Sequence, residues 1–167
     1  MGYLGSSPSG KDINELFIKG AFMEEPRIEG IEEVVIAVKD ADRSVAYFED
    51  IFGMAFPFCW GIPGEKVRVR SARISETQLQ FIESTDPDGV VAKFIREKGE
   101  GLNHIAFRVT NLKEMVKRLK EKGVKLIPEE IVTVENSDIP FRSGKAEYIF
   151  IHPKSACGVL IELVEAK

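Results

Sequence analysis

The stretch Gly30-Ile-Glu-Glu-Val-Val-Ile-Ala-Val38 decides the fold, because it returns later in the chain as Gly101-Leu-Asn-His-Ile-Ala-Phe-Arg-Val109. The correspondence, a shift of 71 positions, continues through the next dozen residues. An internal repeat of this kind indicates an architecture built from similar units. It also puts Glu33 and His104, two residue types that bind metals, at equivalent positions of two strands. A site on the axis between two half-domains is the simplest interpretation.

The bulk composition is that of one globular domain, or of two small halves that share a core. The chain has 167 residues, of which 44% are hydrophobic and 30% charged. A net charge of −4 gives no reason to expect nucleic acid or an anionic membrane as a partner. No apolar run approaches the roughly 20 residues of a membrane span.

The compartment is predicted from the N-terminus and the cysteines. The first ten residues lack the basic and apolar regions of a signal peptide. Cys59 and Cys157 are too few for a disulfide framework. We therefore expect a cytoplasmic protein in which both cysteines are buried or inert.

The same order of elements follows each copy of the repeat. Asp40 or Asp42 is positioned to cap a helix after the first strand, and Gly53 can end that helix. Apolar residues at three- and four-residue spacing mark the helices, and β-branched runs mark the strands. The first half is predicted to have strands near 34–38, 54–60, 66–74 and 77–84, with a linking helix at 90–98. The second half is predicted to have strands near 103–109, 124–133, 146–152 and 158–164, a helix from Asn111 to Gly123, and a long loop at 134–145.

The predicted fold class is α+β. Two tandem βαβββ half-domains would form one curled mixed β-sheet, a trough with the helices outside. We expect a partly flexible N-terminal extension at 1–28. The first module, with its linking helix, would span 29–100, and the second would span 101–167.

Strand alternation selects the side chains that line the trough. If His104 faces inward, the repeat makes Glu33 face inward as well. A charged Glu33 would fit badly against a helix, so this assignment is self-consistent. Overlaying the last strands of the two halves pairs further polar residues, Gln80 with Glu162 and Glu83 with Glu165.

Four inward-facing residues, Glu33, Gln80, His104 and Glu162, then offer three oxygen donors and one imidazole. This set suits a divalent ion in octahedral geometry, with two positions left for water or substrate. Taken singly, each residue has a structural explanation, since a lone histidine in a strand is commonly a hydrogen-bonded core residue. The pairing of the positions by the repeat favours the metal site.

The sequence resembles the vicinal-oxygen-chelate superfamily, which includes glyoxalase I, extradiol dioxygenases and methylmalonyl-CoA epimerase. The likeness is greatest to the epimerase family. It rests on the segments Gly99–Phe107, Phe150–Ser155 and Gly158–Leu163, with looser agreement at Asp40, Asp42 and Tyr47. It covers residues 30–165.

The resemblance implies a metal site with a histidine on the first strand, a Gln or Glu, a second histidine and a final Glu. The last three carry over to Gln80, His104 and Glu162, whereas this chain has Glu33 where an epimerase has its first histidine. A harder oxygen ligand favours Mn²⁺, Co²⁺ or Mg²⁺, with Ni²⁺ or Zn²⁺ possible. The family commonly forms homodimers.

The resemblance also implies the chemistry, which is abstraction of a proton next to a carbonyl. Glu162 would remove the proton, and Glu33 or a water would return it on the other face. The family takes its second base from the third strand of the first half, but Lys66–Val69 carries no carboxylate here. Lys154 and Arg142 are candidates for binding the phosphates of an acyl-CoA substrate.

Three other functions of the same fold remain open. A glyoxalase I-type lyase would use the same metal and the same enediolate chemistry. A dioxygenase is less favoured, because its iron takes two histidines and His152 lies at a strand end. The third is a small-molecule-binding protein without catalysis.

Overall fold

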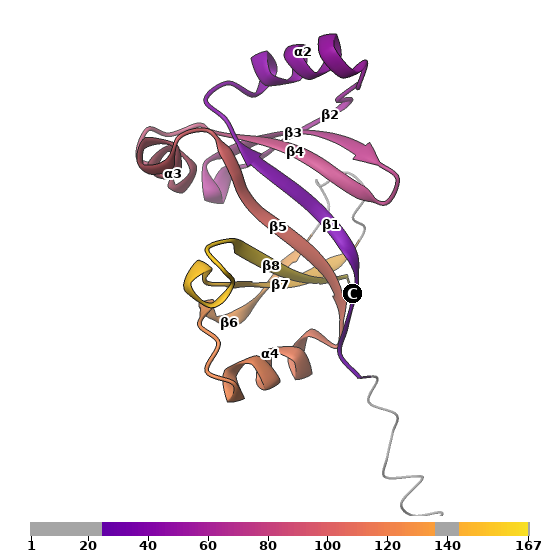
Figure 1. Ribbon diagram of the computed structural model, residues 1–167, viewed down its shortest axis with the longest axis vertical. Helices are drawn as coiled ribbons and strands as arrows, with labels where there is room; N and C mark the ends of the chain where they lie inside the picture. The colour runs from indigo at the N-terminus through magenta and orange to yellow at the C-terminus, as the bar shows by residue number, and fades with distance from the viewer. Residues whose placement is uncertain (1–24, 136–143, 167) are drawn as a thin grey trace, which may run out of the picture.

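The computed structural model describes residues 25–135 and 144–166. A single sheet of eight strands, in the order β2-β3-β4-β1-β5-β8-β7-β6, runs through these residues (Figure 1). The strands are β1 (Arg27–Ala37), β2 (Phe58–Ile62), β3 (Val67–Ile74), β4 (Thr77–Ser84), β5 (Gly101–Thr110), β6 (Leu126–Glu135), β7 (Lys145–Ile151) and β8 (Leu160–Ala166). The helices are α2 (Ala41–Phe52), α3 (Val90–Lys98) and α4 (Leu112–Glu121), with short 3-10 helices at Pro63–Glu65 and Pro153–Ser155.

The centre of the sheet is the antiparallel pair β1 and β5, which carries the two copies of the repeat. In their register Glu33 lies opposite Ala106, and Val35 lies opposite His104. A shift of 71 positions exchanges these two pairs, so an approximate two-fold axis passes between the strands. Each central strand is also parallel to the last strand of its own half, β1 to β4 and β5 to β8. The predicted fold class is confirmed, whereas the predicted boundaries of the halves stay a prediction.

Helices α2 and α4 cover the outer face of the sheet, one over each half (Figure 1). Under α2 lies a buried cluster that includes Val45, Phe56 and Phe81. Under α4 lies the corresponding cluster, with Val116 and Ile149 among its members. Burial of each such side chain stabilises the fold by about 1.5–3 kcal/mol. Phe81 follows Gln80 on β4, so its position under the helix agrees with the strand alternation that turns Gln80 inward.

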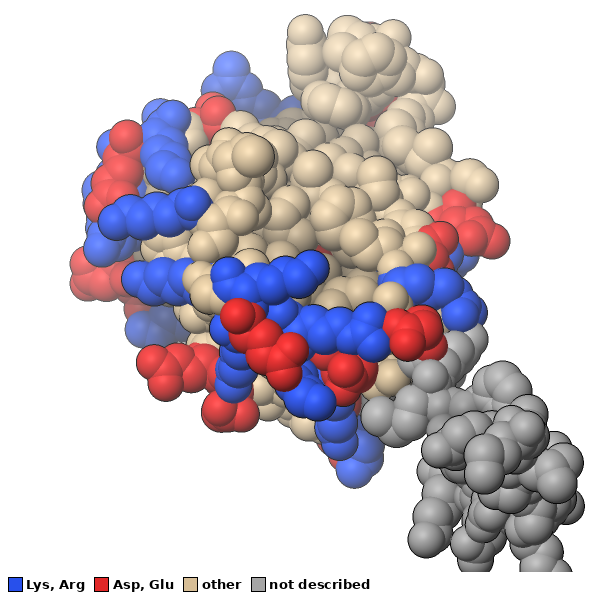
Figure 2. All heavy atoms as spheres, turned by 60° about the horizontal axis from the view of Figure 1, so that its bottom comes forward, with Lys and Arg blue, Asp and Glu red and all other residues tan. Residues whose placement is uncertain are grey.

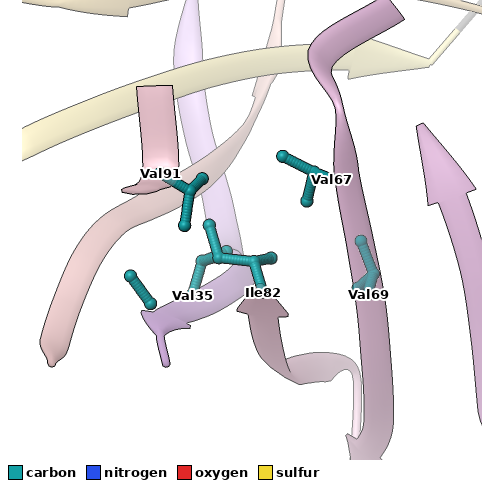
Figure 3. Packing of buried hydrophobic residues seen from close by; sticks show 6 residues of the cluster. Val35, Val67, Val69, Ile82 and Val91 are labelled. Atoms are coloured by element: carbon teal, nitrogen blue, oxygen red, sulfur yellow. The ribbon is translucent and has the colours of Figure 1, made fainter. Parts of the chain in front are cut away.

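Helix α3 packs on the inner face, unlike the other two. Its Val91 is buried against Val35, Val67, Val69 and Ile82 (Figure 3). These side chains come from β1, β3 and β4 and face the same side as Gln80 and Glu33. The linking helix therefore fills one end of the trough.

The start of α2 is capped by Asp40, which resolves the choice between two predicted caps. Its side chain accepts a hydrogen bond from the backbone N–H of Arg43 at 2.9 Å. Asp42 instead pairs with Arg68 and Arg70 of β3. Gly53 ends the helix in the left-handed conformation, with φ of 63°, which glycine adopts without a steric penalty.

Two glutamates at equivalent positions hold the first residues of the outer helices. Glu83 accepts from the backbone N–H of Ala41 at 2.7 Å, and Glu165 accepts from that of Leu112 at 3.3 Å. Glu165 also accepts from the N–H of Asn111 at 2.8 Å. A carboxylate at a helix start satisfies free N–H groups and complements the helix dipole. The pairing of Glu83 with Glu165 in the sequence therefore has a structural cause.

Three details differ from the sequence-based expectations or extend them. Strand β2 begins at Phe58 rather than near residue 54, because Phe56 is buried under α2 and the pairing with β3 starts at Phe58. Cys59 and Cys157 are free and exposed, so of the two alternatives, buried or inert, burial is wrong and inertness stays a prediction. In the described part of the chain, no helix has both the length and the apolar character needed to cross a membrane.

Candidate metal centre

Three of the four predicted metal ligands come together in the trough. One ligand atom from each of Glu33, His104 and Glu162 lies within 4.8 Å of the others. They come from β1, β5 and β8, so both halves contribute. Both carboxylates are buried, each with 7% of its residue surface exposed.

The imidazole of His104 is held with one nitrogen facing the cluster. Its Nδ1 lies 2.8 Å from the amide oxygen Oδ1 of Asn103, which can only accept a hydrogen bond. In the neutral imidazole this contact favours the proton on Nδ1, which leaves the lone pair of Nε2 available to a ligand. Nε2 lies 3.4 Å from Oε2 of Glu162. A second hydrogen bond that fixes the tautomer in this way is a common feature of metal-binding histidines.

The fourth predicted ligand, Gln80, lies on the same face of the sheet. Gln80 on β4 is the register partner of Val35, and Val35 is the partner of His104. The approximate two-fold axis relates Gln80 to Glu162. Gln80 is 5% exposed, as expected for an inward side chain.

The chemistry of this donor set fits a divalent cation. Two buried carboxylates a few ångströms apart repel each other, and buried carboxylates are usually paired or bound to a metal. An imidazole nitrogen with an available lone pair adds a neutral ligand, and an amide oxygen would supply a third oxygen donor. Glu33, Gln80, His104 and Glu162 are thus the residues that would hold the ion.

Two aromatic residues of β7 line the trough beside the cluster. The Phe150 ring meets the His104 ring edge-on, with 5.5 Å between centroids, and Tyr148 lies 5.7 Å further along. Burial and the carboxylates of Glu65 and Glu162 raise the pKa of Tyr148. Its phenol therefore stays neutral over a wider pH range and can donate a hydrogen bond.

Glu65 is a residue near the centre that the sequence did not identify. It ends the 3-10 helix between β2 and β3, directly before the stretch Lys66–Val69 that lacks a carboxylate. It is exposed, yet the surrounding protein desolvates its carboxyl and raises its pKa, as does the neighbouring Glu162, while His104 opposes the shift. Its proximity depends on a turn without hydrophobic periodicity. The only signal in the sequence was its place next to the expected position of a base.

The two predicted substrate-binding residues stay predictions. Arg142 lies outside the described residues. Lys154 is exposed in the 3-10 helix that follows β7, where its backbone N–H donates to Nδ1 of His152 at 3.0 Å. Burial, Lys125 and Lys154 lower the pKa of His152. The role of Lys154 stays a prediction.

A groove of about 540 Å³ lies elsewhere, between α4 and the sheet. It is lined by Glu147, which alternates with the inward Tyr148, so it opens on the outer face. Two of its lysines pair with two of its glutamates, Lys113 with Glu147 and Lys120 with Glu130. Figure 2, which turns this end of the molecule forward, shows Lys and Arg interspersed with Asp and Glu. The groove is therefore not a uniformly charged surface.

The chain is similar in sequence to known proteins over most of its length. The family model of the Glyoxalase/Bleomycin resistance protein/Dioxygenase superfamily matches residues 32–141. The uncharacterized protein YqjC of Bacillus subtilis is 33% identical over 142 residues, which cover 84% of this chain and 93% of that protein. The human mitochondrial methylmalonyl-CoA epimerase is 29% identical over 137 residues, which cover 81% of this chain and 73% of the human protein.

Solved structures of epimerases share the fold. The methylmalonyl-CoA epimerase of Mycobacterium tuberculosis superposes with a TM-score of 0.71 at 30% identity, covering 89% of this chain and 95% of that one. A variant of the Streptomyces coelicolor methylmalonyl-CoA epimerase, in complex with 2-nitronate-propionyl-CoA, superposes with a TM-score of 0.71 at 28% identity. It covers 84% of this chain and 96% of its own. The repeat, the curled sheet and these matches agree, and the chain belongs to the glyoxalase/bleomycin resistance protein/dioxygenase superfamily.

Proposed function

We propose that the chain is a metal-dependent epimerase that acts on methylmalonyl-CoA or a closely similar acyl-CoA. The observation that carries the proposal is the buried cluster of Glu33, His104 and Glu162 on the axis between the halves. The epimerases among its relatives support the choice of reaction and substrate. A bound divalent ion would supply Lewis acidity that stabilises negative charge on the substrate oxygens. Mn²⁺, Co²⁺ or Mg²⁺ would suit the oxygen-rich ligand set, with Ni²⁺ and Zn²⁺ as further possibilities.

In this proposal Glu162 removes the proton next to the carbonyl. Its carboxylate lies in the trough between strands, near Nε2 of His104, and is shielded from bulk water. Phe150 and Tyr148 would line the substrate-binding site and exclude water from it.

Inversion also needs a group that returns the proton on the opposite face. The sequence offered Glu33, and the structure adds Glu65 as a second candidate. The raised pKa of Glu65 keeps it protonated over a wider pH range than an ordinary glutamate, which suits a proton donor. Glu33 lies among the metal ligands, so a bound cation would hold it ionised. We therefore favour Glu65 as the donor.

Deuterium exchange tests the reaction. The protein loaded with Mn²⁺ or Co²⁺ is incubated with one epimer of methylmalonyl-CoA in D₂O, and mass spectrometry follows the α-carbon. We expect deuterium to enter, and Glu162→Gln to reduce exchange to the uncatalysed rate. Glu130→Gln, a change of an exposed carboxylate on β6, is the matched control. Exchange at the background rate in the wild-type protein would refute the epimerase.

Chiral analysis separates the two candidate donors. If Glu65 returns the proton, Glu65→Gln should still exchange the proton of the epimer that Glu162 deprotonates, but should invert it at least about 100-fold more slowly. If Glu33 returns the proton, Glu65→Gln should invert normally. A glyoxalase I-type lyase would instead turn over a thiol adduct and leave methylmalonyl-CoA unchanged.

The cytoplasmic location and the homodimer stay predictions. Sedimentation equilibrium of the full chain would test the dimer.

A further inference from the structure

Gln78 is a buried polar residue of β4 whose role the sequence did not suggest. It is 1% exposed and faces the trough, two residues before Gln80. Its register partner on β1 is Glu33. The approximate two-fold axis relates Gln78 to Leu160, which is the partner of His104 on β8. One half therefore has an amide where the other has an ordinary apolar side chain.

The amide of Gln78 connects two other buried polar groups. Its Oε1 accepts a hydrogen bond from Nε2 of Gln80 at 3.3 Å and another from Oγ of Ser71 at 3.2 Å. Ser71 is the register partner of Gln80 on β3 and is fully buried. Burying three polar side chains among valines and an isoleucine is costly unless their hydrogen bonds are made. A purely apolar inner face would have been the simpler solution for stability.

The direction of these hydrogen bonds decides which end of the Gln80 amide is available. Because Nε2 of Gln80 donates to Gln78, Oε1 is the atom left to act as a ligand. Among the described residues, no group donates a hydrogen bond to that oxygen. A primary amide can flip, and a flipped Gln80 would present N–H donors, which cannot bind a cation.

We propose that Gln78 is a positioning residue, which locks the Gln80 amide with its carbonyl oxygen toward the metal centre. This inference rests on the proposed function, since it assumes that Gln80 is a ligand. Gln78 acts on Gln80 as Asn103 acts on His104, through a hydrogen bond on the far side of the ligand. Outer partners of this kind commonly change metal affinity by 10- to 100-fold.

The test measures Mn²⁺ affinity by electron paramagnetic resonance, without reference to turnover. Gln78→Leu introduces leucine, the residue type that the second half carries at the equivalent position, Leu160. We expect its dissociation constant to rise about 10-fold, in line with other outer partners. The urea midpoint should fall, because the buried Oγ of Ser71 and Nε2 of Gln80 lose their acceptor. Ser71→Ala keeps the contact between the two amides and should change the affinity less than about threefold. If the leucine variant fails to fold, Gln78→Met keeps the side-chain length without the acceptor.

A double-mutant cycle with Gln80→Ala separates positioning from a structural effect. If Gln78 acts through Gln80, removing Gln78 should cost no affinity once Gln80 is gone, so the two changes are not additive. Additive losses of affinity, or unchanged affinity in Gln78→Leu, would overturn the positioning role of Gln78. If the wild-type protein still binds Mn²⁺ in that case, the proposed metal site stands. A wild-type protein that binds no Mn²⁺, with Glu162→Gln as the reference, would overturn both proposals.

Discussion

The two halves of the sheet perform the same structural tasks with different neighbours. Glu83 and Glu165 each hold the first residues of an outer helix. Across the ladder, however, Glu83 faces Arg68, whereas Glu165 faces Glu147. Arg68 binds Glu83 at 2.6 Å and Asp42 at 2.7 Å, which ties β3, β4 and α2 together. The two halves therefore share one backbone arrangement but differ in the charged residues beside these glutamates.

The candidate metal centre shows the same division. Each half supplies two of the four predicted ligands, Glu33 and Gln80 from the first and His104 and Glu162 from the second. The first pair is all oxygen, and the second contains the imidazole. The difference teaches that a repeat fixes positions, while the residues placed there determine the chemistry.

The largest expected effect comes from removing one carboxylate from either half. Glu33→Gln and Glu162→Gln should each weaken Mn²⁺ binding by more than about 100-fold, beyond the effect of outer partners. In the wild type, metal at 100 times its dissociation constant should stabilise the fold by about 2.7 kcal/mol. Calorimetric titration and thermal unfolding with and without EDTA measure both. If only Glu162→Gln loses the metal, the first half contributes no essential ligand.

The second-largest effect is expected from removing Glu83 or Glu165, the two carboxylates at the helix starts. Glu83→Ala should cost about 3 kcal/mol, because it removes both a cap and a charge-assisted bond to Arg68. Glu165→Ala should cost about 2 kcal/mol, for loss of the cap. Urea unfolding measures both free energies. Equal costs would mean that the Arg68 contact contributes nothing to stability.

A smaller difference is expected for the cations that support the halves. Arg68→Met should cost about 1 kcal/mol, since its guanidinium is partly buried between two carboxylates. Lys113→Met should cost less than about 0.5 kcal/mol, because its pair with Glu147 spans 3.8 Å and the lysine is exposed. The same urea assay applies. A larger loss for Lys113 than for Arg68 would show that the pair of Lys113 with Glu147 supports the second half more than its exposure suggests.

The smallest effect is a pH dependence confined to the first half. Hydrogen bonds from Arg68, and the charges of Arg68 and Arg70, hold the pKa of Asp42 below its ordinary value of 3.8, against a smaller opposing effect of desolvation. A lowered pKa gives stability that is present above the unfolded value and lost as the pH falls through the folded value. The wild type should therefore exceed Asp42→Asn in stability at pH 6, and the gap should close below about pH 4. A gap as large at pH 2.5 as at pH 6, or an equal change in the control Asp50→Asn, would contradict this.

Much of the fold and three of the site residues could be predicted from the sequence, because the repeat and strand alternation are local patterns. These patterns predict that Glu33, His104 and Glu162 lie on one face, and the structure brings them together there. Glu65 could not be predicted, since its position depends on the 3-10 helix after β2. Gln78 was missed for another reason, because its meaning lies in the hydrogen bonds of an amide that sequence patterns do not reveal.

In the proposed metal site, affinity would depend on the pairing of β1 with β5 as well as on the ligands. Two ligands from one half alone would hold a divalent ion weakly. Joining the halves would turn the second pair of ligands into an intramolecular partner at high effective concentration. Binding strength would then depend on the contact between β1 and β5 as much as on the ligands. A change in the pairing of β1 with β5 would weaken chelation even if all four ligand side chains remained, and the ion in turn would act as a clasp between two half-sheets.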